Sequence, residues 1–177
     1  MDRTQFDHVI RAAASVVGED DIVVIGSQAI LGAEPEAPEA MLRSMEADVY
    51  PKESPERAIE IDGALGDGSP FHGTFGYYAH GVGPETALAP AGWEERRLVV
   101  EVAGRVGSNQ RVRAHCPEPH DLVLSKCAAN RERDWDFARA GLAAGIVDLG
   151  TLLERVPDLP LTEAEQANIR TRLKTLT

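Results

Sequence analysis

The chain has 177 residues, of which 43% are hydrophobic and 27% charged, a composition typical of a folded globular protein of one domain. No apolar run approaches the roughly 20 residues of a membrane-spanning helix, and the N-terminal segment lacks the basic-then-apolar order of a signal peptide, so we expect a cytoplasmic protein. The net charge of −11 lies in the first half, because residues 1–90 hold 5 basic and 16 acidic side chains. This distribution argues against non-specific binding of nucleic acid over the whole surface, while a local basic face is compatible with the later arginines.

The first 32 residues predict a helix, a strand and a turn into a second helix. Residues 3–17 place apolar side chains at the i, i+3, i+4 spacing of an amphipathic helix that ends at Gly18. Residues 22–25 are β-branched and predict a strand that is buried on both faces. Gly26 and Ser27 follow at once, and Ser27 is suited to cap a helix that begins there.

The middle of the chain predicts one strand, one helix and an irregular segment. Residues 45–50 alternate, with Glu46, Asp48 and Tyr50 on one face. Residues 55–65 predict a helix with Ser54 as its cap. Residues 66–92 are rich in glycine and proline and predict irregular structure with a short strand near Tyr77 and Tyr78.

The second half predicts two strands and then helices only. The strands are residues 98–102 and 112–116, joined by a turn at 107–109. Four helices are expected after them, at residues 119–130, 131–144, 149–156 and 162–176, the last with Thr162 and Glu165 as a capping box. We therefore expect an α+β fold in which a mixed-sheet core, residues 1–116, and a C-terminal helical part, residues 117–177, form a single globular unit. Cys116 and Cys127 are expected to be buried free thiols.

Glu46 and Asp48 are the central candidates for chemistry. Residues two apart on a strand point the same way, which places two carboxylates on one sheet face. A divalent cation would relieve their repulsion, and magnesium is typically held by one or two carboxylates together with substrate phosphates. The alternative is an exposed edge strand with an acidic face.

Gly26 and Ser27 are the second candidate feature. A glycine lets a phosphate approach the backbone, and a helix that starts there offers amide groups to an anion. The alternative is a tight turn without a ligand. The chain lacks a Walker lysine and a G-x-G-x-x-G pattern at this point, which excludes P-loop and Rossmann sites.

Together, a strand, Gly-Ser, a helix and a strand with Glu46-x-Asp48 resemble the signature of the polymerase-beta-like nucleotidyltransferases. The resemblance implies that Gly26 and Ser27 hold a triphosphate and that Glu46 and Asp48 hold Mg²⁺ or Mn²⁺. It also implies a third carboxylate that acts as general base, for which mid-strand Glu101 is the candidate; the alternative is a solvent-facing residue.

The segment from Pro119 to Lys126, followed by residues 130–134, resembles two helices of the AbiEii/MenT-type nucleotidyltransferase toxins and of an uncharacterised subgroup related to them. The resemblance covers roughly residues 20–156. It implies that Lys126 contacts the nucleotide phosphates and that Asp134 completes the catalytic set, with Arg133 beside the nucleotide.

Structural roles are the alternatives for these residues. Lys126 could be a solvated side chain, and Arg133 and Asp134 an ordinary surface pair. Asp121 is most simply a helix cap, with His120 on the surface ahead of it. The aromatic residues at 72, 77 and 78 could stack on a base or only anchor a glycine-rich loop.

These expectations combine into a metal-dependent enzyme that transfers NMP from an NTP to an acceptor hydroxyl, with pyrophosphate as leaving group. The family resemblance implies an RNA 3′ end, such as that of tRNA, as acceptor and a toxin–antitoxin setting with a cognate antitoxin. A protein hydroxyl or a small molecule is the alternative acceptor. The alternative is a catalytically degenerate module with the same fold that binds or regulates, which is favoured by Tyr50 in place of a further acid and by the acidic N-terminal half.

Overall fold

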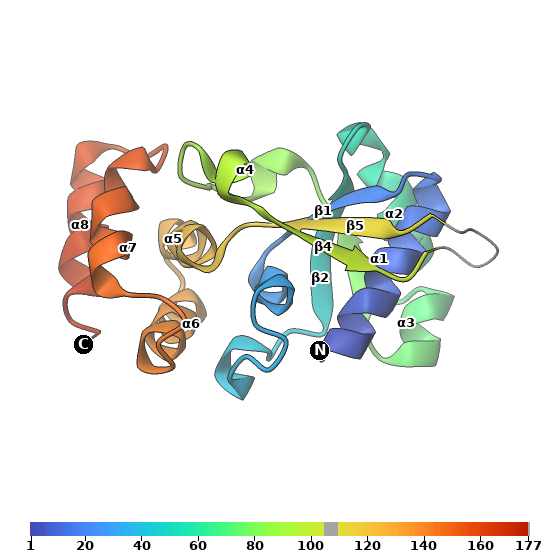
Figure 1. Ribbon diagram of the computed structural model, residues 1–177, viewed down its shortest axis with the longest axis horizontal. Helices are drawn as coiled ribbons and strands as arrows, with labels where there is room; N and C mark the ends of the chain where they lie inside the picture. The colour runs from blue at the N-terminus through green and yellow to red at the C-terminus, as the bar shows by residue number, and fades with distance from the viewer. Residues whose placement is uncertain (105–109, 177) are drawn as a thin grey trace.

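The protein has an α+β fold in which one mixed sheet is flanked by helices and followed by further helices at the C-terminus (Figure 1). The structure is a computed structural model that describes residues 1–104 and 110–176. The fold class expected from the sequence is confirmed. The turn expected at residues 107–109 lies outside the described residues.

Five strands form the sheet in the order β3-β2-β1-β5-β4. They are β1 Asp21–Ile25, β2 Glu46–Pro51, β3 Tyr78–Gly81, β4 Leu98–Val102 and β5 Val112–Cys116. β1 is antiparallel to β2 and parallel to β5, whereas β2 is parallel to β3 and β4 is antiparallel to β5. The central strand is therefore the buried run after the first helix.

The described residues form eight α-helices and five short 3₁₀-helices. The α-helices are α1 Arg3–Val17, α2 Ala58–Leu65, α3 Pro70–Phe75, α4 Trp93–Arg96, α5 Pro119–Ala129, α6 Glu132–Ala143, α7 Leu149–Arg155 and α8 Glu163–Leu173. The 3₁₀-helices are η1 Ser27–Gly32, η2 Glu39–Met41, η3 Pro55–Arg57, η4 Pro84–Thr86 and η5 Val156–Asp158. Among these described helices, none is both long and apolar enough to cross a membrane.

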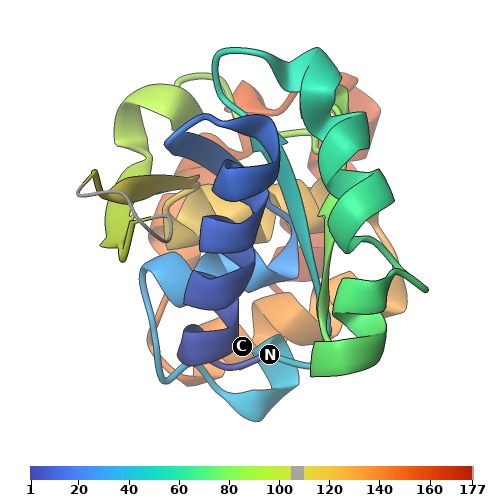
Figure 2. The same cartoon turned by 90° about the vertical axis from the view of Figure 1, so that its right-hand side faces the viewer.

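One face of the sheet packs against the main apolar core, and the other face carries the acidic pair. α1 and α2 lie side by side over one face, while the C-terminal helices lie beyond the sheet (Figure 2). Ile22 and Val24 of β1 belong to the main apolar core that includes α1, whereas Val23 and Ile25 belong to a smaller cluster with Tyr50. Alternation along β2 then places Ala47 and Val49 in the main core, and Glu46 and Asp48 on the opposite face. The acidic pair thus faces away from α1.

The main core also contains residues of α5 to α8, so the sheet and the C-terminal helices share one apolar interior. Leu122 and Trp135 are each 1% exposed within it. The division of the chain at residue 116 stays a prediction. Both cysteines are buried and free, as expected.

Several local predictions are correct in place and wrong in detail. α1 has its expected bounds and ends at Gly18, whose φ of +72° lies in the left-handed region. The element after Gly26 is a 3₁₀-helix in which Ser27 makes no cap hydrogen bond, and Ser54 likewise caps nothing. The segment expected to be irregular contains the helix α3, which Ser69 caps by accepting a hydrogen bond from the His72 amide.

Candidate active site at the Glu46 and Asp48 face of the sheet

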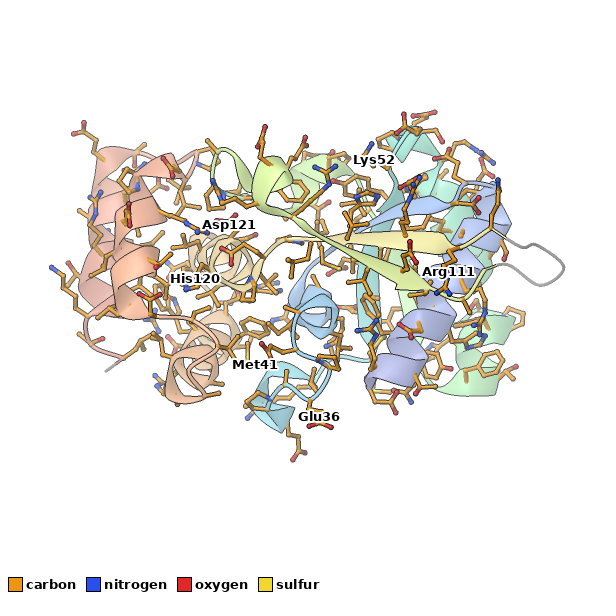
Figure 3. The ribbon with its side chains drawn as sticks, in the orientation of Figure 1. Glu36, Met41, Lys52, Arg111, His120 and Asp121 are labelled. Carbon is orange, nitrogen blue, oxygen red and sulfur yellow. The ribbon has the colours of Figure 1, made fainter. Side chains whose placement is uncertain are left out.

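A cleft of about 650 Å³ opens between the acidic face of β2 and the junction of α5 with α6. All seven residues of the predicted site line it, namely Gly26, Ser27, Glu46, Asp48, Lys126, Arg133 and Asp134. Met41, the last residue of η2, is 1% exposed and forms part of another wall where η2 packs against α6 (Figure 3). The structure therefore brings together residues that are up to 108 positions apart in the chain.

Gly26 and Asp48 lie in such close contact that the turn requires glycine. Ile25 pairs with Asp48 across β1 and β2, so Gly26 follows directly beside the carboxylate. Its φ of +71° and ψ of −174° lie in a region that glycine alone adopts readily. A Cβ atom at position 26 would lie 2.1 Å from Asp48 Oδ2. The glycine is needed both for the turn and for the position of the carboxylate.

The two carboxylates each have one neutral or weakly basic partner on β3. The Tyr78 hydroxyl donates to Glu46 Oε2 at 2.8 Å, and His80 Nδ1 lies 3.0 Å from Asp48 Oδ1. Burial raises the pKa of Asp48, and the nearby charge of Glu46 raises it further against the opposing effects of His80 and Lys126. The hydrogen bond to Glu46 raises the pKa of Tyr78 to about 12. Asp48 is thus a partly desolvated carboxylate without full charge compensation.

Lys126 extends from the last turn of α5 toward the carboxylates. Its Nζ lies 3.9 Å from Asp134 Oδ1, and its side chain is 14% exposed. Burial lowers the pKa of Lys126, while the charges of Asp134 and Asp48 oppose this shift. Asp134 is 2% exposed and accepts a 2.7 Å hydrogen bond from Arg131 Nε. The expected surface pair of Arg133 with Asp134 is wrong, because Asp134 is buried and pairs with Arg131 and Lys126.

The cleft also carries two arginines that form no ion pair with the described residues. Arg43 precedes β2 and Arg133 lies in the first turn of α6, and both line the cleft and are exposed. With Lys126 and Arg131 they supply positive charge opposite Glu46 and Asp48. An acidic and a basic wall therefore face one cleft, which suits a ligand that combines a cation with phosphates.

The arrangement of carboxylates fits a phosphate-bound metal better than a metal held by protein alone. Among residues 1–104 and 110–176, no group of three or more His, Cys, Asp or Glu side chains is arranged to hold a metal ion. Glu46 and Asp48 supply two oxygen ligands on one face, and magnesium ordinarily completes its octahedron with water and substrate phosphates. These two residues would hold such an ion.

Some candidates lie outside the cleft. Glu101 on β4 has a 61% exposed side chain and lies 3.5 Å from Arg111. Arg111 lies at the end of the sheet remote from the C-terminal helices (Figure 3). Glu101 is a solvent-facing strand residue. Tyr77 packs with Phe71 and Phe75 against His8, whose Nδ1 lies 2.8 Å from the Tyr77 hydroxyl. Tyr77 thus anchors α3, whereas Tyr78 contacts Glu46 of the acidic pair.

His80 is the cleft residue that the sequence reasoning missed. It lies opposite Asp48 on β3 and lines the cleft, and its side chain is 48% exposed. The alternation of Tyr78 and His80 two positions apart was the available signal. It was weak, because nothing in the sequence shows which strand pairs with β2.

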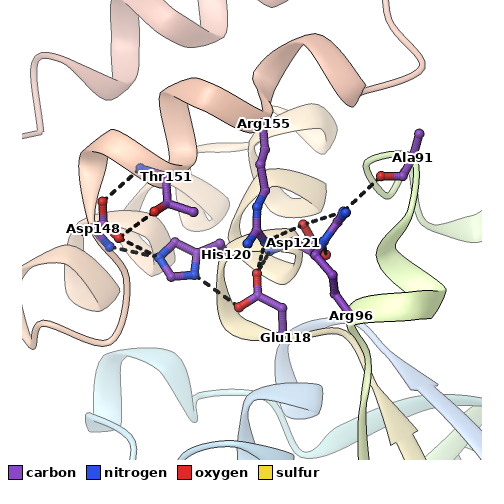
Figure 4. A network of polar contacts seen from close by, with 8 residues as sticks. All are labelled: Ala91, Arg96, Glu118, His120, Asp121, Asp148, Thr151 and Arg155. Carbon is purple, nitrogen blue, oxygen red and sulfur yellow. Dashed lines mark hydrogen bonds and ion pairs between the residues drawn. The ribbon is translucent and has the colours of Figure 1, made fainter.

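His120 and Asp121 belong to a buried ion-pair network instead of the cleft (Figure 4). We call it the α5 network; it consists of Arg96, Glu118, His120, Asp121, Asp148 and Arg155. Asp121 is fully buried, with Arg96 Nε at 2.8 Å and Arg155 Nη1 at 3.1 Å. The expectation that Asp121 caps the helix is wrong, since Glu118 is the cap and accepts from the Asp121 amide.

The α5 network joins α4, α5 and α7. His120 lies 3.1 Å from Glu118 Oε2 and 3.2 Å from Asp148 Oδ2. Burial alone would raise the pKa of Glu118, but His120 and Arg155 lower it to about 2. The hydrogen bond with Glu118 raises the pKa of His120. The network holds the start of the helix that carries Lys126 at its other end.

The fold and the cleft together define the class, an α+β protein of the polymerase-beta-like nucleotidyltransferase type. A family model described as nucleotidyltransferase of unknown function (DUF6036) matches residues 4–175, and the chain belongs to this family. Membership supports transfer of a nucleoside monophosphate as the general activity. No curated protein and no solved structure matches the chain significantly.

Proposed function

We propose that the protein transfers NMP from a magnesium-bound NTP to the hydroxyl of an acceptor. The observation that carries the proposal is the convergence of Gly26, Asp48 and Lys126 on one cleft, with the Asp48 carboxylate packed against the turn. A bound magnesium ion would neutralise charge on the phosphates and polarise the α-phosphorus.

The protein's own groups then bind and orient the substrate. Ser27 and the backbone beside Gly26 lie where a triphosphate can approach the turn, and the Lys126 ammonium supports it from α5. The acceptor hydroxyl loses its proton to solvent, its oxygen forms a bond to the α-phosphorus, the bond to the bridging oxygen breaks, and pyrophosphate leaves. Asp134 positions Lys126 and Arg131 through its ion pairs.

For the acceptor we propose an RNA 3′ end, such as that of tRNA, in a toxin–antitoxin setting with a cognate antitoxin. Support comes from the resemblance of the α5 and α6 segments to the AbiEii/MenT-type toxins, and from Arg43 and Arg133, which offer unpaired positive charge to a phosphate backbone at the cleft. The chain as a whole carries a net charge of −11, so contact with RNA would be confined to this region.

The proposal is tested by incubating the protein with each α-labelled NTP, Mg²⁺ and total RNA, followed by a denaturing gel. We expect a labelled band of tRNA size that disappears with Asp48→Asn and persists with Glu101→Gln, an exposed acid outside the cleft. Label on a protein or a small molecule would change the acceptor only. Absence of transfer under every NTP would favour the alternative, a degenerate module that binds or regulates.

A further inference from the structure

A second pocket of about 100 Å³ adjoins the cleft behind the phosphate-cradling turn. It shares Ile25, Gly26, Ala87 and Ser125 with the cleft, so the two spaces meet at the turn. We call it the side pocket. Both spaces therefore lie against the Gly26 turn, and the part of a ligand next to phosphates bound there would lie close to the side pocket.

The side pocket has the lining of a site for a planar aromatic ring. Tyr50 and Trp93 contribute aromatic rings, and Ile25 and Leu122 contribute apolar surface. Tyr50 and Trp93 also belong to the small apolar cluster on the face of the sheet that carries Asp48. Stacking on such rings is how proteins hold nucleobases independently of their sequence.

Two polar groups in the lining of the side pocket make no hydrogen bond within the described part of the chain. They are the Tyr50 hydroxyl and the indole N–H of Trp93, and neither atom is fully buried. Both are hydrogen-bonding groups, so a ligand in the pocket can pair with them in place of water. An unpartnered hydroxyl in a pocket lining points to a ligand that supplies the missing hydrogen bond.

The polar edge also indicates which bases the pocket prefers. Glu94 lines it with a carboxylate, which only accepts hydrogen bonds when ionised. Adenine, cytosine and guanine each present an exocyclic amino group, whereas the single donor of uracil, N3–H, lies between two carbonyl oxygens that a carboxylate repels. The Tyr50 hydroxyl can donate to a ring nitrogen or a carbonyl beside that amino group.

We propose that the side pocket binds the nucleobase of the NTP, with Trp93 stacking on the base, the Tyr50 hydroxyl donating to its edge, and Glu94 selecting bases that carry an amino group over uracil. This inference rests on the proposed function, because it places the triphosphate at Gly26 and Ser27. In this proposal Tyr50 recognises the base, whereas Glu46 and Asp48 of the same strand hold the metal ion.

The test is calorimetric titration, in Mg²⁺, with inorganic tripolyphosphate and with non-transferable α,β-methylene analogues of ATP, GTP, CTP and UTP. We expect amino-bearing analogues to bind at least about tenfold more tightly than tripolyphosphate, as stacking on aromatic walls implies. Tyr50→Phe weakens them by about fivefold, the effect of one hydrogen bond, and leaves tripolyphosphate unchanged. Glu94→Gln reduces the discrimination against the UTP analogue.

Two matched controls separate these effects from folding. Tyr77→Phe removes a comparably buried hydroxyl outside both pockets, and Glu95→Gln removes the neighbouring exposed charge on α4. Neither should alter nucleotide binding. Tripolyphosphate binding that depends on Asp48, with no further gain from any nucleotide, overturns the base pocket and leaves the proposed function standing. Failure of tripolyphosphate and of every nucleotide to bind overturns both.

Discussion

The cleft and the α5 network both hold partly or fully buried carboxylates, and their charges are balanced in opposite ways. In the cleft, burial and the charge of Glu46 raise the pKa of Asp48, so its ionised form is held at a cost. In the α5 network, His120 and Arg155 outweigh burial and lower the pKa of Glu118 to about 2. A carboxyl group with a shifted pKa therefore indicates a binding site in this protein where the neighbouring protein charges do not compensate its own charge, as at Asp48.

The comparison predicts that acids of the two regions contribute to different properties. Glu46 and Asp48 of the cleft should matter for activity and little for stability. Acids of the α5 network should matter for stability, and for activity only through the position of α5. The predictions below test this division.

Asp48→Asn gives the largest expected effect. We predict a loss of transfer activity of about 10³-fold, because the substitution removes one of the two oxygen ligands and its charge. The thermal midpoint should stay unchanged or rise, since an amide removes the repulsion with Glu46. Transfer assays and thermal denaturation check both parts; a large fall in the midpoint would contradict the division.

Asp121→Asn is the matched change in the α5 network. We predict a loss of about 3 kcal/mol of unfolding free energy, because Arg96 and Arg155 would then face each other without a shared buried charge. Urea denaturation at neutral pH measures this loss. The account of the network is wrong if stability changes by less than about 0.5 kcal/mol, the range of ordinary surface substitutions.

Gly26→Ala should lower both transfer activity and stability, each by less than the substitutions of Asp48 and Asp121 do. The backbone there is unsuited to a side chain, which costs about 1–3 kcal/mol, and the new methyl group would displace the Asp48 carboxylate. A displacement of about 1 Å corresponds to an activity loss of about 10²-fold. Gly68→Ala is the control, since Gly68 also has a positive φ of +73° but nothing lies within 4 Å of a Cβ atom there.

The free energy of unfolding should depend on pH because Glu118 and His120 form an ion pair. The folded-state pKa of Glu118 is depressed from 4.5 to about 2, so its stabilisation is present above about pH 4.5 and falls by about 2 kcal/mol by pH 3. The pKa of His120 is raised from 6.5, so its stabilisation is full below pH 6.5 and is lost as pH rises through the folded value. Denaturant titrations across pH 3–9 should show both losses reduced by His120→Gln.

Glu101→Gln should have the smallest effect. Glu101 is exposed on β4 and pairs with Arg111 at 3.5 Å, a type of contact worth little in water. Activity should remain within about twofold, in contrast to what a general base would show. A loss of about 10²-fold would return Glu101 to the catalytic set.

Much of the fold could be predicted because local patterns determined it. The helix at 3–17 and the strands at 98–102 and 112–116 have the predicted bounds, since the apolar pattern of each segment depends on local sequence alone. The 3₁₀ form of residues 27–32 and the helix α3 could not be predicted, because short helices depend on tertiary packing more than on propensity.

For the candidate site, the sequence predicted the acidic pair on one sheet face but not the side chains from other elements that contact it. Glu46 and Asp48 share a face because of strand alternation, which needs no tertiary information. His80 and Tyr78 contact them only because β3 pairs with β2, a long-range choice. The burial of Asp121 likewise depends on arginines from α4 and α7, which lie 25 and 34 residues away.

The most direct test of the central claim is the affinity of the protein for an NTP with and without Mg²⁺, measured by calorimetry on the wild type and on Asp48→Asn. We predict binding that weakens at least about tenfold when Mg²⁺ is removed or Asp48 is replaced. Binding that is equally tight in all three conditions would show that Glu46 and Asp48 hold no metal-bound nucleotide.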